Sequence, residues 1–386
     1  MPQLLVCSKA MQAVPRNAFL PIEWSIEFPG SSSSEGKNVD CTEKLCSVTH
    51  VFRAVNLGVL SLTAHKLGQN IMGQMFCRAF VPYFHVVFTV PAPIAAVALQ
   101  NKAVVYDILL KAAAETIRII GADPKHLGAE TGMIAILHSW GQTLTHHPHA
   151  HFVVPGGGLA PDGRWVGCRP NFFLPVHVLS SLYRRLFLER LEATFEAGQL
   201  GFFGRLARLV KPAAFARYLQ PLRKVDWVVY AKRPFGGPQQ VLDYLGRYTH
   251  RVAIANSRLL ACESGHVRFR WKDYRAGNKS KVMTLDAHEF IRRFLLHVLP
   301  KGFRRIRHFG FLANACRAAK LARIRAALHA PEPTPTNEPV DFRARYAALT
   351  GHRIDVCPVC EGHMVEIGVW PRSPRMPRSM PCWNTS

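Results

Sequence analysis

The chain contains 386 residues, enough for one sizeable hydrophobic core with appended segments. Its 49 Lys and Arg residues outnumber its 25 Asp and Glu residues, and the formal net charge of +24 indicates a polyanionic partner. The sequence lacks a run of about eighteen apolar residues, a secretion signal and the cysteine pattern of a disulfide scaffold, so we expect no membrane span and a cytoplasmic location.

The first 80 residues show no sustained hydrophobic period, and a serine-rich stretch at residues 31–36 is typical of a linker. From residue 81 onward the pattern becomes regular. Phe84–Val90 and Gly132–Leu137 predict strands, and Ile94–Ile120 predicts a helix between them.

Residues 146–158 read His-His-Pro-His-Ala-His-Phe-Val-Val-Pro-Gly-Gly-Gly. Residues 150–154 predict a short buried strand that stops at a proline and three glycines. Side chains two residues apart on a strand point the same way, so His149 and His151 share one face while Ala150 and Phe152 pack behind them. Two imidazoles held in this way can share one divalent ion. The alternative is a pair of polar histidines on an exposed strand edge.

His147 and His149 also stand two residues apart and form a second candidate pair. The pair His149 and His151 is preferred, because Ala150 packs between them and the strand continues through apolar residues. His147 and His151 would lie about 13 Å apart, too far for all three histidines to bind one ion directly. Mg²⁺ or Mn²⁺ requires a further protein ligand. The candidates, which the sequence does not rank, are His138, Gln142 and Asp243.

A helix is predicted from Pro238 onward, and it places Tyr244 and Tyr248 one above the other on the same face. A phenol can attack a phosphodiester and stay bonded to the phosphate, while a metal ion polarises that phosphate. The alternative is an amphipathic helix with two buried rings and solvated hydroxyls. Together with the histidine strand, the tyrosine pair favours the catalytic interpretation.

The remaining pattern predicts alternating strands and helices around an antiparallel sheet, which is an α+β fold. A mostly helical insertion is expected over residues 176–219, and a stiff proline-rich linker over residues 331–336 precedes a small tail. Asp286 and Glu289 form a capping pair for a helix that runs to Val298. The strands predicted after the insertion are Asp226–Ala231, Val252–Ala255, Val267–Trp271 and Val282–Leu285.

Basic residues cluster in two segments without any acidic residue, residues 202–224 and residues 300–330. Aromatic residues lie between the charges, as expected where bases stack along a groove that follows a nucleic-acid strand. Solvated helix faces are the alternative for many individual residues. The candidate DNA contacts in and around the basic and tyrosine segments are Lys232, Arg233, Arg247, Arg251, Arg304, Arg305 and Arg307.

Five runs of this chain, in the same order, resemble the two-tyrosine rolling-circle transposases of bacterial insertion sequences, known as the insertion sequence ninety-one family. These transposases are a branch of the HUH endonucleases, which are named for a histidine, a hydrophobic residue and a second histidine. The resemblance extends over roughly three quarters of the chain. The five runs are residues 83–91 (YFHVVFTVP), 137–142 (LHSWGQ), 146–158, 244–251 (YLGRYTHR) and 303–312 (FRRIRHFGFL).

The resemblance implies an antiparallel sheet with flanking helices, an HUH nuclease-like core whose central strand carries the histidines and whose tyrosine helix faces it. It implies metal-dependent nicking and joining of single-stranded DNA ends through a 5′-phosphotyrosine, with Tyr244 and Tyr248 as nucleophiles in unspecified order. His149 and His151 would bind the Mg²⁺ or Mn²⁺, and the protein would act on element ends and target DNA at the bacterial nucleoid. The alternatives are a replication initiator or relaxase of the same superfamily, and a non-catalytic DNA-binding remnant.

The two ends of the chain depart from the family pattern. Family members begin with a zinc-binding domain that contains paired Cys-x-x-Cys motifs, and residues 1–80 contain no such pair. We therefore expect a divergent N-terminal region over 1–80, a catalytic domain over 81–330 and a tail over 331–386. In the tail, Cys357 and Cys360 could bind Zn²⁺ with nearby histidines. Two unpaired thiols in a loop are the alternative.

Overall fold

The structure is a computed structural model that describes residues 3–7, 81–232, 253–274, 276–330, 353, 356 and 364–369. The chain divides into two compact units. One unit comprises Met1–Asp40, Val51–Thr63 and Thr336–Ser386, and within it β1 (Gln3–Cys7) pairs with β12 (Met364–Val369) in antiparallel fashion. The other unit comprises Cys41–His50 and Ala64–Pro335.

The larger unit is built on an antiparallel sheet of five strands in the order β11-β3-β4-β2-β7. The histidine strand β4 is central, as predicted, but it is longer than expected and begins at His146. It begins there because a tight turn, in which the Gly141 N–H donates to the Thr145 carbonyl at 3.0 Å, brings Trp140 opposite His146. The strands are β2 (Tyr83–Thr89), β3 (Gly132–Trp140), β4 (His146–Pro155), β7 (Val229–Lys232) and β11 (Ile306–Gly310).

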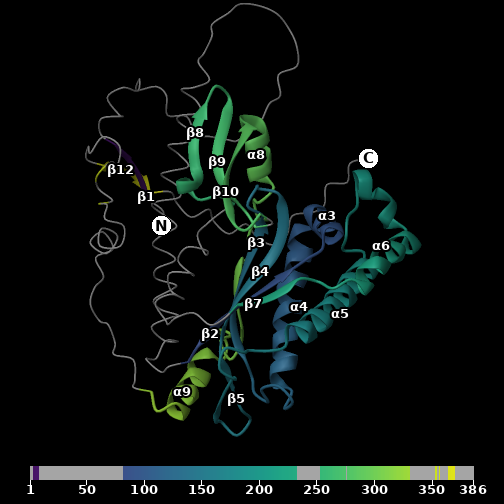
Figure 1. Cartoon of the computed structure of the whole chain (residues 1–386), viewed down its shortest axis with the longest axis vertical. Helices are drawn as coiled ribbons and strands as arrows, with labels where there is room; N and C mark the ends of the chain where they lie inside the picture. The colour runs from purple at the N-terminus through teal and green to yellow at the C-terminus, as the bar shows by residue number, and fades with distance from the viewer. Residues whose placement is uncertain are drawn as a thin grey trace, which may run out of the picture. The chain divides into compact units, whose positions relative to one another are not determined.

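Helices cover one face of this sheet, and α4 and α5 lie side by side along it (Figure 1). The single helix predicted over Ile94–Ile120 is wrong, because the chain forms two helices that break at Asn101. The Asn101 side chain instead bonds the main chain of Gly201, accepting from its N–H at 2.8 Å and donating to its carbonyl at 2.9 Å. The helical elements are α3 (Ala92–Gln100), α4 (Lys102–Ala122), α5 (Val176–Glu196), the short 3₁₀ helix η1 (Gly204–Val210) and α6 (Pro212–Lys224).

The main hydrophobic core lies between the sheet and these helices. Strand alternation sends Phe88 of β2 together with Ala150 and Phe152 of β4 into this core, and all three are fully buried. The prediction that Ala150 and Phe152 pack behind the histidines is therefore confirmed. The opposite face of the sheet carries the histidines, together with a smaller apolar cluster around Ile136 and Val153. This packing fixes the register of β4, since a slip by one residue would turn the histidines into the core.

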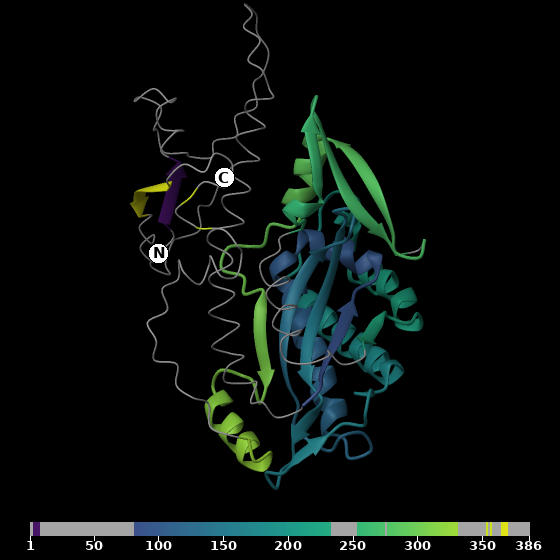
Figure 2. The same cartoon turned by 60° about the vertical axis from the view of Figure 1, so that its left-hand side comes forward.

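A second, three-stranded antiparallel sheet and the helix α8 stand beside the end of β3 and β4 (Figures 1 and 2). The strand predicted at Val252–Ala255 is wrong for its described residues: Ala253 has a positive φ of 55° and is buried against Leu144, so the chain turns before β8 begins. The elements are η2 (Asn256–Arg258), β8 (Leu259–Glu263), β9 (His266–Asp273), β10 (Lys279–Asp286) and α8 (Ala287–Leu295).

The predicted capping pair of α8 is half right. The Asp286 carboxylate accepts from the main-chain N–H groups of His288 and Glu289, as an N-cap should. The Glu289 carboxylate does not reach back to the cap but binds Arg292 and Arg293 one turn later. The helix also ends at Leu295, short of the predicted Val298.

Three further elements belong to the larger unit. The hairpin of β5 (Gly157–Leu159) and β6 (Trp165–Gly167) follows β4, and α9 (Arg317–Ala327) follows β11. A side chain at residue 157 would collide with the Trp165 ring, which accounts for a glycine at the start of β5, just after the histidine strand. Among the described helices, none is both long and apolar enough to cross a lipid bilayer.

Candidate metal centre

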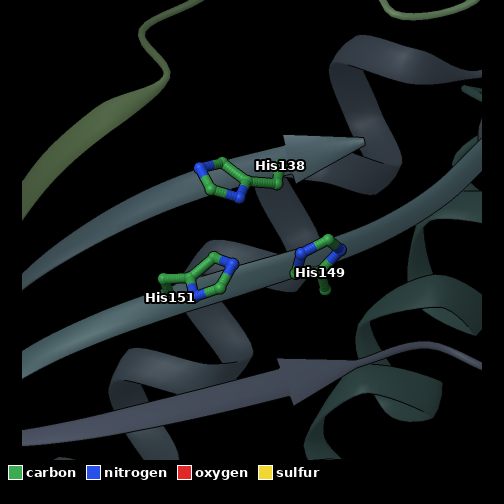
Figure 3. A group of neighbouring side chains, drawn as sticks. All are labelled: His138, His149 and His151. Carbon is green, nitrogen blue, oxygen red and sulfur yellow. The ribbon is translucent and has the colours of Figure 1, made fainter. Parts of the chain in front are cut away.

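Three histidines converge on the face of the sheet opposite the helices. The pairing of β3 with β4 places His138 directly opposite His149, and His151 follows two residues later on the same face. One ring nitrogen from each lies within 4.8 Å of the others, and Figure 3 shows the three rings turned toward one another. Of the third ligands considered from the sequence, the structure brings His138 to the pair.

A main-chain hydrogen bond fixes the tautomer of His149. Its Nδ1 lies 2.7 Å from the carbonyl oxygen of His147. A carbonyl only accepts, so Nδ1 carries the proton and Nε2 keeps a free electron pair. A metal-binding histidine is commonly oriented through its second nitrogen in this way.

His151 is oriented by a fourth histidine. Nε2 of His85, on β2, lies 2.8 Å from Nδ1 of His151, and the two ring planes differ by 8°. His85 is buried, and its strand runs beside β4 in the sheet. The bond occupies Nδ1 of His151, which leaves Nε2 of that ring for the shared site.

Burial keeps the imidazoles of His85, His149 and His151 neutral. It lowers the pKa of His149 from 6.5 to about 4 and that of His85 to about 3, and the charge of Lys232 adds to the effect on His85. Burial also lowers the pKa of His151 well below its ordinary value, with the neighbouring histidines contributing. A neutral imidazole is the form that binds metal ions.

The donor set of the triad fits a divalent metal ion. Ring nitrogens of three histidines converge from two rigid strands, burial lowers the pKa of His149 and His151, and at His149 the hydrogen bond leaves Nε2 unprotonated. Imidazole nitrogens favour transition-metal ions over Mg²⁺, which prefers oxygen. The triad can therefore bind a divalent cation while leaving coordination positions for another ligand.

The surroundings of the triad are aromatic on one side and cationic on the other. The Trp140 ring stacks on His138 with ring centroids 4.4 Å apart. On β7, Lys232 pairs with His85 across the strands, so its exposed side chain lies on the histidine face. Tyr230 shares that face, and the Lys232 ammonium lies 5.8 Å from its ring centroid. A stacking ring and a cation beside a metal site suit a nucleotide and its phosphate.

A cavity of about 510 Å³ opens beside the histidine strand. It is lined by His146 and His147, by residues 89–92 at the junction of β2 and α3, and by residues 225–228. His147, the alternative ligand considered from the sequence, therefore lines the cavity and does not belong to the triad of His138, His149 and His151.

Of the remaining candidate residues, the structure describes four, and the others lie outside the described residues. Arg304 is exposed, Arg305 is partly buried, and Arg307 donates to Asp107 of α4 at 2.5 Å. Gln142, considered as a ligand, donates instead to the Tyr274 hydroxyl at 3.0 Å. The candidates that lie outside the described residues are Tyr244, Tyr248, Asp243, Arg233, Arg247, Arg251, Cys357 and Cys360.

Sequence reasoning did not single out His85 or Trp140. His85 lies in the run 83–91, where alternation with Phe84 and Val86 places it on the histidine face. That signal was present in the sequence. Its contact with His151 depends on strand pairing across 66 residues, which the local pattern does not contain.

The known proteins that this chain is similar to include transposases. Residues 132–320 match the model of the family Y2_Tnp, described as "Putative transposase". The chain is 59% identical over 308 residues to "Putative transposase y4qJ" of Sinorhizobium fredii, covering 79% of this chain and 77% of that protein. It is 30% identical over 257 residues to the transposase for insertion sequence element IS801 of Pseudomonas savastanoi, covering 66% of this chain and 60% of that protein.

Among solved structures, the conjugative relaxase TrwC in complex with oriT DNA matches with a TM-score of 0.24 and 12% identity, covering 42% of this chain and 71% of that chain. The sequence relationships to the two transposases are much stronger. By these relationships, the chain belongs to the two-tyrosine insertion-sequence transposases of the insertion sequence ninety-one type.

Proposed function

We propose that this transposase nicks and rejoins single-stranded DNA at the ends of a mobile element by transesterification on tyrosine. The observation that carries the proposal is the triad His138, His149 and His151, whose ring nitrogens lie within 4.8 Å of one another, in a chain that belongs to a transposase family. The expected catalytic domain, residues 81–330, contains the triad and the candidate nucleophiles Tyr244 and Tyr248.

The chemistry requires no external energy source. The phenol oxygen of Tyr244 or Tyr248 forms a bond to the scissile phosphorus, and the bond from phosphorus to the 3′ oxygen breaks. The phenol proton is lost, the leaving oxygen takes up a proton, and the products are a 5′-phosphotyrosine and a free 3′ hydroxyl. The ester stores the bond energy, so a 3′ hydroxyl can later attack it and join two strands.

The roles of the described residues follow from their positions. His138, His149 and His151 would hold the cation, and His85 and the His147 carbonyl orient two of these rings. When bound, a divalent ion supplies Lewis-acid polarisation of the scissile phosphate. Lys232 would neutralise phosphate charge beside the triad, and Trp140 offers an aromatic surface next to His138.

Chain connectivity supports a tyrosine near the triad. Ala253 is buried in a cluster that includes Trp140, the residue that stacks on His138. Tyr248 precedes Ala253 by five residues, and five residues span at most about 18 Å when fully extended. The tyrosine segment thus rejoins the described chain at a residue that packs in the same cluster as Trp140.

The partner we propose is single-stranded DNA at the bacterial nucleoid, bound through exposed cations near the triad. Arg304 and Lys232 are the exposed candidates among the described residues, and Arg233, Arg247 and Arg251 belong to the tyrosine segment. A net charge of +24 supports strong, salt-dependent binding to nucleic acid. In the tail, Cys357 and Cys360 would bind Zn²⁺.

Strand-specific labelling tests the proposed reaction. Single-stranded oligonucleotides that span a verified element end are incubated with the protein and Mn²⁺, labelled either at the 3′ or at the 5′ terminus. A 5′-phosphotyrosine leaves the 3′-labelled fragment on the protein and releases the 5′-labelled fragment with an extendable 3′ hydroxyl. If the 5′-labelled fragment stays on the protein instead, the mechanism is overturned. Cleavage that persists in excess chelator also overturns it. Binding without cleavage supports the non-catalytic remnant.

A further inference from the structure

The outer face of the second sheet carries a row of exposed cations. β9 alternates strictly, with Val267 and Phe269 buried beneath the sheet and Arg268, Arg270 and Lys272 exposed above it. The three cations stand two residues apart, so the row extends over about 14 Å. This row was not among the DNA contacts predicted from the sequence.

The neighbours of this row leave its charges uncompensated. On β10, Lys272, Arg270 and Arg268 face Ser280, Val282 and Thr284. On β8, Arg268 faces Ala261. Among the described residues, the three cations form no ion pair within 4.0 Å, whereas Lys281, on the buried side of the same sheet, binds Asp273 at 2.7 Å.

Acidic groups near the sheet are engaged elsewhere or lie at its far end. Asp273 holds Lys281, and Asp286 caps α8. Glu263 pairs across the strands with His266, at the end of β9 away from Lys272. The middle of the face is thus an exposed cationic row among uncharged neighbours. A row of phosphates would complement its charge.

We propose that Arg268, Arg270 and Lys272 bind the phosphate backbone of double-stranded DNA, next to the single strand that is cut. Successive phosphates of one strand advance about 3.4 Å along a duplex, so a row of about 14 Å matches roughly four such steps.

The composition of the face favours duplex over single-stranded DNA. Surfaces that bind single strands offer aromatic rings on which bases stack. In this sheet, Phe269 is fully buried, and Trp271 is partly buried on the side that packs toward α8. Tyr274 is exposed at the end of β9, but its hydroxyl accepts from Gln142. The rest of the face offers charge without stacking surfaces.

The sheet is tied to the turn between β3 and β4, the two strands that carry the triad. Arg258, just before β8, donates to the Gln142 carbonyl at 2.5 Å, and Phe269 packs in the cluster that includes Trp140. Trp140 in turn stacks on His138. Duplex DNA held on the sheet would therefore stand at a defined distance from the triad, which gives the sheet a role in placing the cut.

The proposal builds on the proposed function, and the experiment separates the two. The full chain is compared with the triple variant Arg268→Gln, Arg270→Gln, Lys272→Gln. A matched control, Arg118→Gln, Lys125→Gln, Arg185→Gln, removes the same charges from exposed positions on the helix side of the sheet. Anisotropy measures the affinity for a hairpin duplex over a salt series, and labelled oligonucleotides measure cleavage of a short single strand.

We expect the sheet variant to bind the duplex at least about tenfold more weakly, with a salt slope smaller by about 2.7, because each lost phosphate contact removes about 0.9. Its cleavage of the short single strand should equal that of the unchanged chain, and the control should keep the original slope. Duplex affinity and slope equal to the control overturn the duplex surface, even if cleavage is normal. Equal losses for duplex and short single strand show instead that the row binds single strands. If the unchanged chain does not cleave, the proposed function fails. The comparison of duplex binding between the sheet variant and the control still tests whether the sheet binds duplex DNA.

Discussion

His149 donates its Nδ1 proton to the main-chain carbonyl of His147, at 2.7 Å, and so presents Nε2 to His138 and His151. The acceptor belongs to the backbone, not to the His147 imidazole. The histidine-rich tract thus contains two kinds of residue. His149 and His151 build the site, and the His147 side chain lines a neighbouring cavity.

We predict that replacing any one of His138, His149 or His151 with Ala removes measurable Mn²⁺ binding and cleavage of an element-end oligonucleotide. DNA binding should be largely retained, because affinity comes from the basic surface. Isothermal titration with Mn²⁺ alone gives the metal affinity, and a gel assay gives cleavage. Unchanged cleavage in the His149→Ala and His151→Ala variants would refute the ligand assignment.

His147→Ala is the matched control for this series. It deletes an imidazole from the same strand but keeps the carbonyl that orients His149. We expect Mn²⁺ affinity close to that of the unchanged chain. A loss as large as that of His149→Ala would favour the pair His147 and His149 as ligands.

His85 should act on the metal through His151. Replacing it with Phe keeps a buried ring but removes the bond to Nδ1, and such outer partners typically change metal affinity by about 10- to 100-fold. His85→Gln can restore a polar atom near Nε2 and should recover part of the affinity. Equal Mn²⁺ affinity in the Phe variant and the unchanged chain would exclude this positioning role.

Acid should destabilise the fold through His297. This buried imidazole lies between the Ser139 hydroxyl and the Leu144 carbonyl, and burial lowers its pKa from 6.5 to about 4, with Lys102 adding to the effect. Between these values the unfolded chain binds a proton that the folded chain does not. Its contribution to the free energy of unfolding is therefore intact above pH 6.5 and falls by about 1.4 kcal/mol per pH unit down to about pH 4.

Thermal unfolding at pH 7 and pH 5 checks this sign. His297→Gln, which keeps a donor for Leu144, should lose less stability between the two pH values than the unchanged chain. His288→Gln, at an exposed position on α8, is the control and should retain the original pH dependence. Parallel pH profiles for all three proteins would contradict the assignment to His297.

Within the basic run 304–307, we predict that Arg304 contributes to DNA binding and that Arg307 contributes to folding stability. Replacing Arg304, Arg305 and Arg307 together is expected to weaken binding to single strands of any sequence, but Arg307 also holds Asp107 at 2.5 Å. We expect Arg304→Ala alone to lower the salt slope by about 0.7 for single strands. Arg307→Ala should cost about 1–3 kcal/mol of folding stability, and Asp107→Asn should mimic that loss. A salt slope unaffected by Arg304→Ala would mark Arg304 as a solvated residue.

Local periodicity predicted the features that depend on one strand or one helix. The shared face of His149 and His151, with Ala150 and Phe152 buried behind it, follows from the two-residue repeat of a strand. The central position of this strand followed from the family resemblance and is confirmed.

The features that the sequence did not predict depend on contacts between distant residues. His138, one of three candidate ligands that the sequence did not rank, is selected by the register of β3 with β4, and the helix break at Asn101 results from its bonds to Gly201. The basic run around Arg307 reads as a charged surface, yet it forms an edge strand, because Ile306–Gly310 pairs with β3. Such pairings are set by the whole fold, and composition alone does not contain them.

The most direct test of the account is a covalent adduct that depends on the tyrosine pair. A phosphotyrosine ester survives boiling in detergent, so single-stranded DNA from an element end should migrate with the protein when Mn²⁺ is present. The double variant Tyr244→Phe, Tyr248→Phe keeps both rings and removes only the hydroxyls, and each single variant serves as its control. We predict that the adduct forms with the unchanged chain, persists in part in a single variant and disappears in the double variant. An adduct that persists in the double variant would contradict the account, because the nucleophile would then lie elsewhere.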